Sequence, residues 1–144
     1  MPLESETEIA ALLAGARVIA LVGASDRPER ASHEVMQFLQ RRGYRVVPVN
    51  PQLAGQVLLG ETVLAGLDEI AGKIDIVDIF RRSEAVGPIV AEAIAVGAGA
   101  VWMQLGVINA EAAAAAEAAG LKVVMNRCPK IELSRRGSGP SGTH

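Results

Sequence analysis

Short apolar runs recur along the chain, separated by segments in which apolar residues repeat every three or four positions. Each run is too short for a typical helix and is apolar almost throughout, which suits strands buried on both faces of a parallel sheet. We therefore expect five strands, at residues Val18–Val22, 44–49, 73–80, 99–105 and Lys122–Met125.

The segments between these runs carry helix signals. Ser5 begins the first segment as an N-cap, and Glu8 completes an S-x-x-E capping box. The segment after the first run is amphipathic, because Val35, Phe38 and Leu39 share one helical face. Further helices are expected at residues 83–97 and 110–119, with a short edge strand at 56–59 and a single helical turn at 67–71.

Strands that alternate with helices predict an α/β protein. Right-handed connections between parallel strands place helices on both faces, so the expected fold is a doubly wound, Rossmann-like, mostly parallel sheet. The 144-residue length fits a single domain, which we place at residues 1–134. Residues 135–144, RRGSGPSGTH, are rich in glycine, serine and proline and predict a disordered tail.

Composition narrows the functional classes. With 14 basic and 16 acidic residues, the chain lacks the positive field of a typical nucleic-acid-binding protein, so no nucleic-acid partner is expected. No apolar run reaches membrane-spanning length, and the first residues, MPLESETE, lack signal-peptide features. We therefore expect a cytoplasmic protein without membrane contact. One cysteine and two histidines predict neither a disulfide framework nor a zinc site.

The loop after the first run is the strongest candidate for a functional site. It begins at Gly23 and leads into a helix, whose first N–H groups and positive dipole end attract anions, most often phosphate. The dinucleotide pattern G-x-G-x-x-G is absent, because Ser25 and Pro28 stand at its second and third glycine positions. The alternative is that Gly23 serves only a tight turn. If it approaches a phosphate, Gly23→Val is expected to abolish binding and leave most of the fold intact.

The other candidates come from the ends of the expected strands. In doubly wound sheets, ligands bind outside the carboxyl ends of the strands, where the winding reverses. The residues that follow the five strands are Gly23, Ala24 and Ser25; Val49, Asn50 and Pro51; Phe80, Arg81 and Arg82; residues 103–106, which include Gln104; and residues 126–129, which include Cys128.

No catalytic set is visible among these positions. Asp75 and Asp78 lie inside the expected third strand rather than at its end, so they are not predicted to form an acid–base pair. Cys128 follows Arg127 and precedes Lys130 by two positions, and such cations favour a thiolate able to meet a thiol or thioester. The alternative for Cys128 is a structural thiol. A binding module is therefore favoured over an enzyme.

Five segments together make the chain recognisable. VGASDRPERAS, GYRVVPVNP, VDIFRRSEAV, VWMQLGVINAEA and GLKVVMNRCPKIE occur in this order within about residues 10–133. With them the chain resembles the small stand-alone CoA-binding proteins, relatives of the CoA-binding domain at the N-terminus of the succinyl-CoA synthetase alpha subunit. The resemblance implies a doubly wound fold that holds the nucleotide end of coenzyme A or an acyl-CoA.

The resemblance also implies where the ligand lies. In that family the glycine loop meets the diphosphate, the N-P turn faces the adenosine, and the end of the third strand lies alongside. Carried over residue by residue, this places Gly23, Ala24, Ser25 and Ser32 near the diphosphate, Val49, Asn50 and Pro51 near adenine or ribose, and Phe80 with Arg81 as the other wall. Gln104, at the fourth strand end, completes the expected contacts.

Alternatives remain for the polar members of this set. Arg81 and Arg82 suit the 3′-phosphate of CoA, since arginine forks match phosphate oxygens, but either one is also a plausible solvated charge before a helix. Asn50 is also a plausible turn residue before Pro51.

The expected function is binding of CoA or acyl-CoA as a small-molecule ligand, with the protein partner unknown. One rival is an NAD(P)-binding oxidoreductase on the same fold. Against it stands Asn50 at the end of the second strand, where a ribose-binding acid would be expected. The other rival is an interaction protein with a vestigial nucleotide pocket. The phosphohistidine domain and the nucleotide-binding subunit of succinyl-CoA synthetase have no counterpart in this sequence, so ligase activity is not expected.

Overall fold

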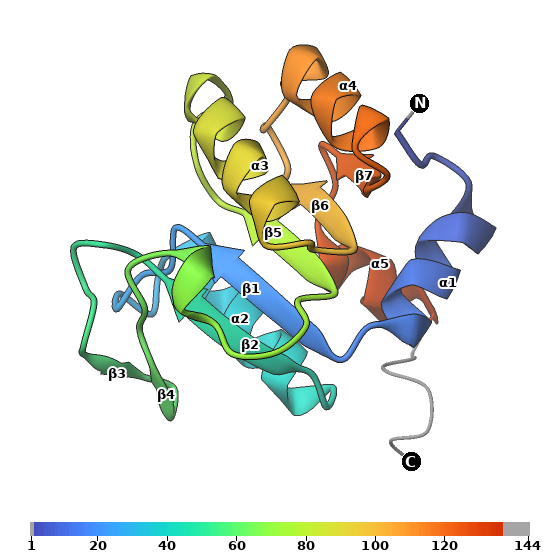
Figure 1. The fold of residues 1–144 in the computed structure, drawn as a ribbon. Coiled ribbons are helices and arrows are strands. Elements are labelled where there is room, and N and C mark those ends of the chain that lie inside the picture. Colours follow the sequence, from blue (N-terminus) through green and yellow to red (C-terminus); the bar gives the residue numbers. More distant parts are fainter. Residues whose placement is uncertain (1, 137–144) are drawn as a thin grey trace.

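A five-stranded parallel sheet forms the centre of the protein (Figure 1). The structure, a computed structural model, describes residues 2–136. The strand order is β2-β1-β5-β6-β7, so the winding reverses beside β1. The strands are β1 (Val18–Val22), β2 (Arg45–Val49), β5 (Ile76–Ile79), β6 (Ala100–Met103) and β7 (Lys122–Met125). The predicted doubly wound α/β fold is confirmed.

Helices cover both faces of this sheet (Figure 1). One face packs against α1 (Glu6–Gly15), α2 (Ala31–Arg41) and α5 (Pro129–Arg136). The other packs against α3 (Val86–Ala95) and α4 (Ala110–Ala118), which also contact each other. None of the helices within residues 2–136 is long and apolar enough to cross a membrane.

A small hairpin and two short 3₁₀ helices complete the described chain. β3 (Val57–Leu58) and β4 (Glu61–Thr62) form a separate antiparallel pair, so the short strand expected at residues 56–59 is not an edge of the main sheet. The helical turn expected at 67–71 is the 3₁₀ helix η1 (Leu67–Glu69). A second one, η2 (Ser83–Ala85), precedes α3.

The helix α5 is missing from the sequence-based expectations. Pro129 occupies its first position, where the absent N–H costs no helical hydrogen bond. Leu133 is fully buried in the core on the same side as α2, and Trp102 Nε1–H donates a 2.8 Å hydrogen bond to the carbonyl of Arg127 just before the helix. α5 extends two residues into the segment predicted as a tail, while residues 137–144 lie outside the described residues.

Both edges of the sheet carry additional backbone pairing. At the β2 edge, Leu64 N–H donates to the carbonyl of Pro48 at 3.0 Å, and Asn50 N–H donates to the carbonyl of Leu64 at 2.9 Å. At the β7 edge, Leu3 N–H donates to the carbonyl of Val123 at 2.7 Å. Segments outside the sheet therefore occupy part of its edge hydrogen-bonding capacity.

The two aspartates of the third apolar run have different environments. Asp75 precedes β5 instead of lying within it, which corrects the expected strand boundary. Its Oδ2 accepts 2.9 Å hydrogen bonds from the backbone N–H groups of Arg17 and Val18, so Asp75 fixes the start of β1. This carboxylate serves the amino end of the sheet, at the opposite end from the loops that follow the strands.

Asp78 lies in the middle of β5 and is completely buried. It is paired in register with Leu21 on one side and Trp102 on the other. Within the described chain neither carboxyl oxygen has a hydrogen-bond partner, and burial raises the pKa of Asp78 well above its ordinary value of 3.8. The native state therefore favours the neutral acid, since an unpaired buried charge would be costly.

This burial predicts how stability depends on pH. Below the pKa that Asp78 has in the unfolded state, its carboxyl is neutral in both the native and the unfolded protein, and the full stability of the native state is present. This stability is lost as the pH rises towards and through the pKa that Asp78 has in the native state. Between these pKa values unfolding releases a proton, so Asp78 lowers the free energy of unfolding by up to about 1.4 kcal/mol per pH unit. Asp78→Asn cannot ionise, so its stability relative to the parent should increase from pH 5 to pH 8. Urea denaturation at several pH values measures this difference, and a pH-independent difference would contradict the prediction.

Candidate functional site

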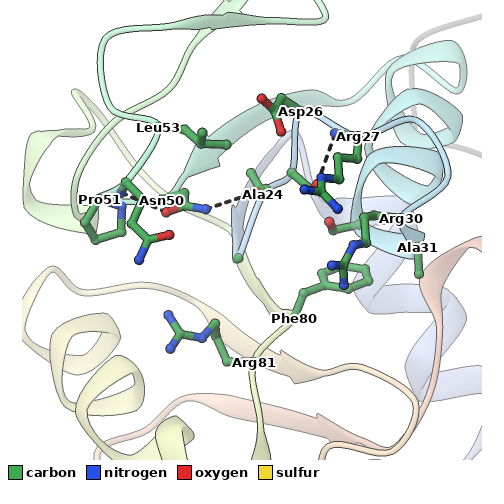
Figure 2. Close-up of a pocket in the computed structure, with 14 residues that line it drawn as sticks. Ala24, Asp26, Arg27, Arg30, Ala31, Asn50, Pro51, Leu53, Phe80 and Arg81 are labelled. Carbon is green, nitrogen blue, oxygen red and sulfur yellow. Dashed lines mark hydrogen bonds between the residues drawn. The ribbon is translucent and has the colours of Figure 1, made fainter.

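A pocket of about 670 Å³ lies at the carboxyl ends of the strands, where the winding reverses between β1 and β5 (Figure 2). We call it the switch-point pocket. Its walls come from the loops after β1, β2 and β5 and from the start of α2. The lining residues are Gly23, Ala24, Ser25, Asp26, Arg27, Arg30, Ala31, Ser32, Asn50, Pro51, Gln52, Leu53, Phe80 and Arg81.

Gly23 lets three loops meet at the base of this pocket. Its φ angle is +91°, and a Cβ atom at this position would overlap the carbonyl oxygen of Phe80. Its N–H donates to the carbonyl of Val49 at 3.0 Å. The tight turn and the position beside the pocket therefore occur together. The expectation that Gly23→Val leaves most of the fold intact is contradicted, because backbone rather than empty space lies against this glycine.

Asn50 fastens two of these loops together. Its Nδ2 donates a 2.9 Å hydrogen bond to the carbonyl of Ala24, and its Oδ1 accepts one of 2.9 Å from the N–H of Gln52 (Figure 2). The turn role considered for Asn50 is therefore present, and the same residue also lines the pocket. With both ends of its amide engaged, Asn50 fixes the shape of the pocket wall.

The start of α2 is open towards the pocket. The cap residue Arg30 makes no side-chain capping hydrogen bond, although Arg30, Ala31 and Ser32 all line the pocket. Ser25 does not cap the helix either, since its Oγ accepts a 3.1 Å hydrogen bond from the N–H of Arg27. The first N–H groups of a helix have no intrahelical partner. Together with the helix dipole they provide a site suited to an anion.

Three arginines add positive charge around this helix start. Arg27 and Arg30 precede α2, while Arg81 stands on the opposite wall (Figure 2). All three are exposed, and among residues 2–136 no carboxylate forms a salt bridge with them. The only acidic residue of the lining is Asp26. The pocket therefore combines helix N–H groups with three unpaired guanidinium groups.

Sequence reasoning missed part of this lining. It did not select Asp26, Arg27, Arg30, Ala31, Gln52 or Leu53. The two arginines had a usable signal, because they lie between Gly23 and the helix in the loop already assigned to phosphate. The wall around Leu53 had no such signal in the sequence, because the position of this loop depends on the hairpin that comes after it.

Three predicted contacts lie elsewhere. Val49 is buried and contributes its carbonyl to the fold, accepting from Gly23 N–H at 3.0 Å and from Ala24 N–H at 3.4 Å. Arg82 is exposed and pairs with Glu84 at 3.3 Å. Arg82 and Gln104 line a different pocket. These residues are therefore not part of the switch-point pocket lining.

This second pocket, of about 640 Å³, lies between α2, α5 and the ends of β5 and β6; we call it the α2–α5 pocket. Ala31, Phe80 and Arg81 belong to both pockets, so the two adjoin. Cys128 forms part of its wall and is buried. The cations near Cys128 are engaged, since Lys130 pairs with Glu34 and Arg127 with Glu132. In the described chain, no group of three or more His, Cys, Asp or Glu side chains could hold a metal ion.

The fold and the pocket define a doubly wound α/β protein with a site suited to an anionic ligand at its switch point. Within this class the chain belongs to the CoA binding domain family, which it matches over residues 17–134. This confirms the family suggested by the sequence segments.

Similar proteins cover nearly the whole chain. The uncharacterized protein YneT of Bacillus subtilis is 40% identical over 127 residues, which are 88% of this chain and 93% of that protein. A solved structure from Thermus thermophilus, cell-free ID.343, is 38% identical with a TM-score of 0.88, covering 92% of this chain and 98% of that one. A hypothetical protein from Pyrococcus horikoshii OT3 is 38% identical with the same TM-score, covering 94% and 95%.

The contact at Gly23 yields a stability prediction with a matched control. Gly23 and Gly55 both have a φ angle of +91°, but no atom lies within 4 Å of the position that a Cβ on Gly55 would take. Gly55→Ala should lower the free energy of unfolding only by the backbone strain, about 1–3 kcal/mol. Gly23→Ala should lower the free energy of unfolding by about 1–3 kcal/mol more, because its Cβ overlaps with Phe80. Urea denaturation of both variants compares them, and equal losses would show that Phe80 yields without cost.

Proposed function

We propose that the protein binds coenzyme A or an acyl-CoA, with the nucleotide and diphosphate end of the ligand in the switch-point pocket. The observation that carries this proposal is the open start of α2, which faces a pocket surrounded by Arg27, Arg30 and Arg81. The membership of the chain in the CoA binding domain family supports the choice of ligand.

The lining suggests how the parts of CoA are distributed. The diphosphate lies against the backbone at Gly23, Ser25 and Ser32, where the α2 dipole and the free N–H groups stabilise its charge. The adenosine packs on the wall formed by Pro51 and Leu53. The arginines meet the remaining phosphate oxygens, including those of the 3′-phosphate that NAD lacks.

Binding without catalysis at the nucleotide end of the ligand is part of the proposal. The described lining of the switch-point pocket contains no cysteine, histidine, lysine or glutamate, and its single carboxylate is Asp26. A nucleophile with an adjacent base and an orienting group is therefore absent from these fourteen residues. We assign the protein a carrier or sensor role for the CoA compound, and its expected cytoplasmic location remains a prediction.

Ligand choice provides the direct test. A thermal-shift series with CoA, dephospho-CoA, NAD and NADP should give the largest increase in melting temperature for CoA. A ligand at a hundredfold excess over its Kd stabilises the native state by about 2.7 kcal/mol, which corresponds to several degrees. A larger shift with NAD than with CoA would favour the oxidoreductase rival. No shift with any of the four would favour a vestigial pocket.

Arg81 should contribute to recognition of the phosphates. Arg81→Ala removes a charged donor from the pocket wall, so Kd for CoA should increase about tenfold or more. Arg45→Ala is a matched control. Arg45 is exposed at the amino end of β2, so this substitution removes the same charge far from the pocket lining. Isothermal titration calorimetry measures both variants. Equal effects of the two substitutions would mean that Arg81 acts only through net charge.

A further inference from the structure

The α2–α5 pocket has a lining unlike that of its neighbour. Its side chains are largely apolar and come from four separate elements. Leu105 and Ile131 are 54% and 43% exposed, so the apolar character continues to the mouth. Apolar cavities of a few hundred cubic ångströms with few polar groups are typical of small-molecule sites. The apolar lining comprises Ala31, Val35, Phe80, Leu105, Val107, Cys128 and Ile131.

Gln104 supplies a polar group inside this apolar lining. Only 6% of its surface is exposed, and within residues 2–136 its Oε1 atom has no hydrogen-bond partner. A buried amide oxygen without a donor is unfavourable, and because Oε1 is enclosed by protein, a ligand N–H group in the pocket reaches it only if the Gln104 side chain turns towards the pocket. The backbone of Gln104 is fixed, because its N–H donates to the carbonyl of Ile79 at 3.3 Å.

The two pockets lie next to each other and share three lining residues. Ala31 at the start of α2 and the pair Phe80 and Arg81 after β5 line both. A ligand whose diphosphate lies at the start of α2 can therefore continue across Phe80 into the second pocket. The pantetheine arm of CoA is attached to the diphosphate, contains two amide groups and ends in the thiol that carries the acyl group. One of its amide N–H groups would be a suitable donor for the unpartnered oxygen of Gln104 once that side chain turns towards the pocket.

We infer that the ligand is an acyl-CoA thioester with an uncharged aliphatic acyl chain, which the α2–α5 pocket holds beyond Gln104. This inference rests on the proposed binding of CoA in the switch-point pocket. It adds the chemical class of the acyl group and the place where the group is bound.

The charges around the pocket disfavour an acidic acyl group. Lys130 at the wall is paired with Glu34, and Arg82 is paired with Glu84 at 3.3 Å. Arg81 stands between the pockets, where the phosphates attract it. A carboxylate at the end of the acyl chain would lie among Val35, Val107 and Ile131, and burying such a charge in apolar surroundings is costly.

Calorimetric titration of the full chain tests this inference with CoA and with acetyl-, butyryl-, hexanoyl- and succinyl-CoA. Each added methylene that enters the pocket should tighten binding about threefold to fourfold from acetyl to hexanoyl. Butyryl- and succinyl-CoA have four acyl carbons each, so the comparison isolates the carboxylate. Succinyl-CoA should bind more weakly than butyryl-CoA.

Two surface variants test where the acyl chain of the ligand lies. Ile131→Asp places a charge at the mouth of the pocket on an exposed residue, so it should flatten the dependence of Kd on acyl chain length, measured relative to CoA with the same variant. Ile108→Asp is the control, because Ile108 is 51% exposed and lines neither pocket. The control should retain the full dependence.

The outcomes separate the inference from the proposed function. If CoA binds but all acyl-CoA compounds bind equally, or if succinyl-CoA binds as tightly as butyryl-CoA, the inference is wrong and CoA binding stands. If Ile131→Asp keeps the parent's chain-length dependence, the acyl chain lies elsewhere and the assignment of the pocket is wrong. If neither CoA nor any acyl-CoA binds, the proposed function itself fails.

Discussion

The close contact between Gly23 and Phe80 is the constraint on which the ligand side of the protein depends. The backbone after β1 and the backbone after β5 meet with no room for a side chain between them. The carbonyl of Val49 accepts from Gly23 N–H, and Asn50 fastens the same loop through the carbonyl of Ala24. The ends of three neighbouring strands thus form one rigid base. The start of α2 and the arginines are positioned from this base, so geometry that is chiefly backbone determines where an anion can be held.

Much of this arrangement could be predicted from sequence, because it follows from local pattern. Apolar runs alternating with amphipathic segments were sufficient for the parallel sheet and its helices, and Gly23 pointed to a loop that lines the switch-point pocket. The direction of individual side chains could not be predicted in the same way. Asn50 turned out to hold loops together, and Val49 contributes its carbonyl to the same loops and its side chain to the core, because both roles depend on how the strand ends approach one another. The helix α5 was missed since its pattern is short and follows directly after a strand-end segment.

Asp78 and Gln104 show how a buried sheet can carry polar groups at a cost. Asp78 is on the central strand β5 and Gln104 directly follows β6, and in both the side-chain oxygens lack partners within the described chain. Asp78 responds by favouring the neutral acid, because no neighbouring group compensates its charge. Gln104 cannot change its protonation, so its amide oxygen depends on a donor from another group. Two similar defects in hydrogen bonding thus have different remedies, one in the group itself and one in a second group.

Pro48 gives the outer edge of β2 a further property. Its carbonyl faces outwards to Leu64, so its nitrogen faces the same way, and this nitrogen has no hydrogen to donate. A strand from another copy of the chain would meet no N–H donor at Pro48, and the carbonyl of Pro48 already accepts from Leu64. Edge-to-edge growth of the sheet between molecules is thereby hindered. Pro48 thus opposes β-sheet aggregation at this edge in a concentrated solution, and the same residue has a regular place in β2.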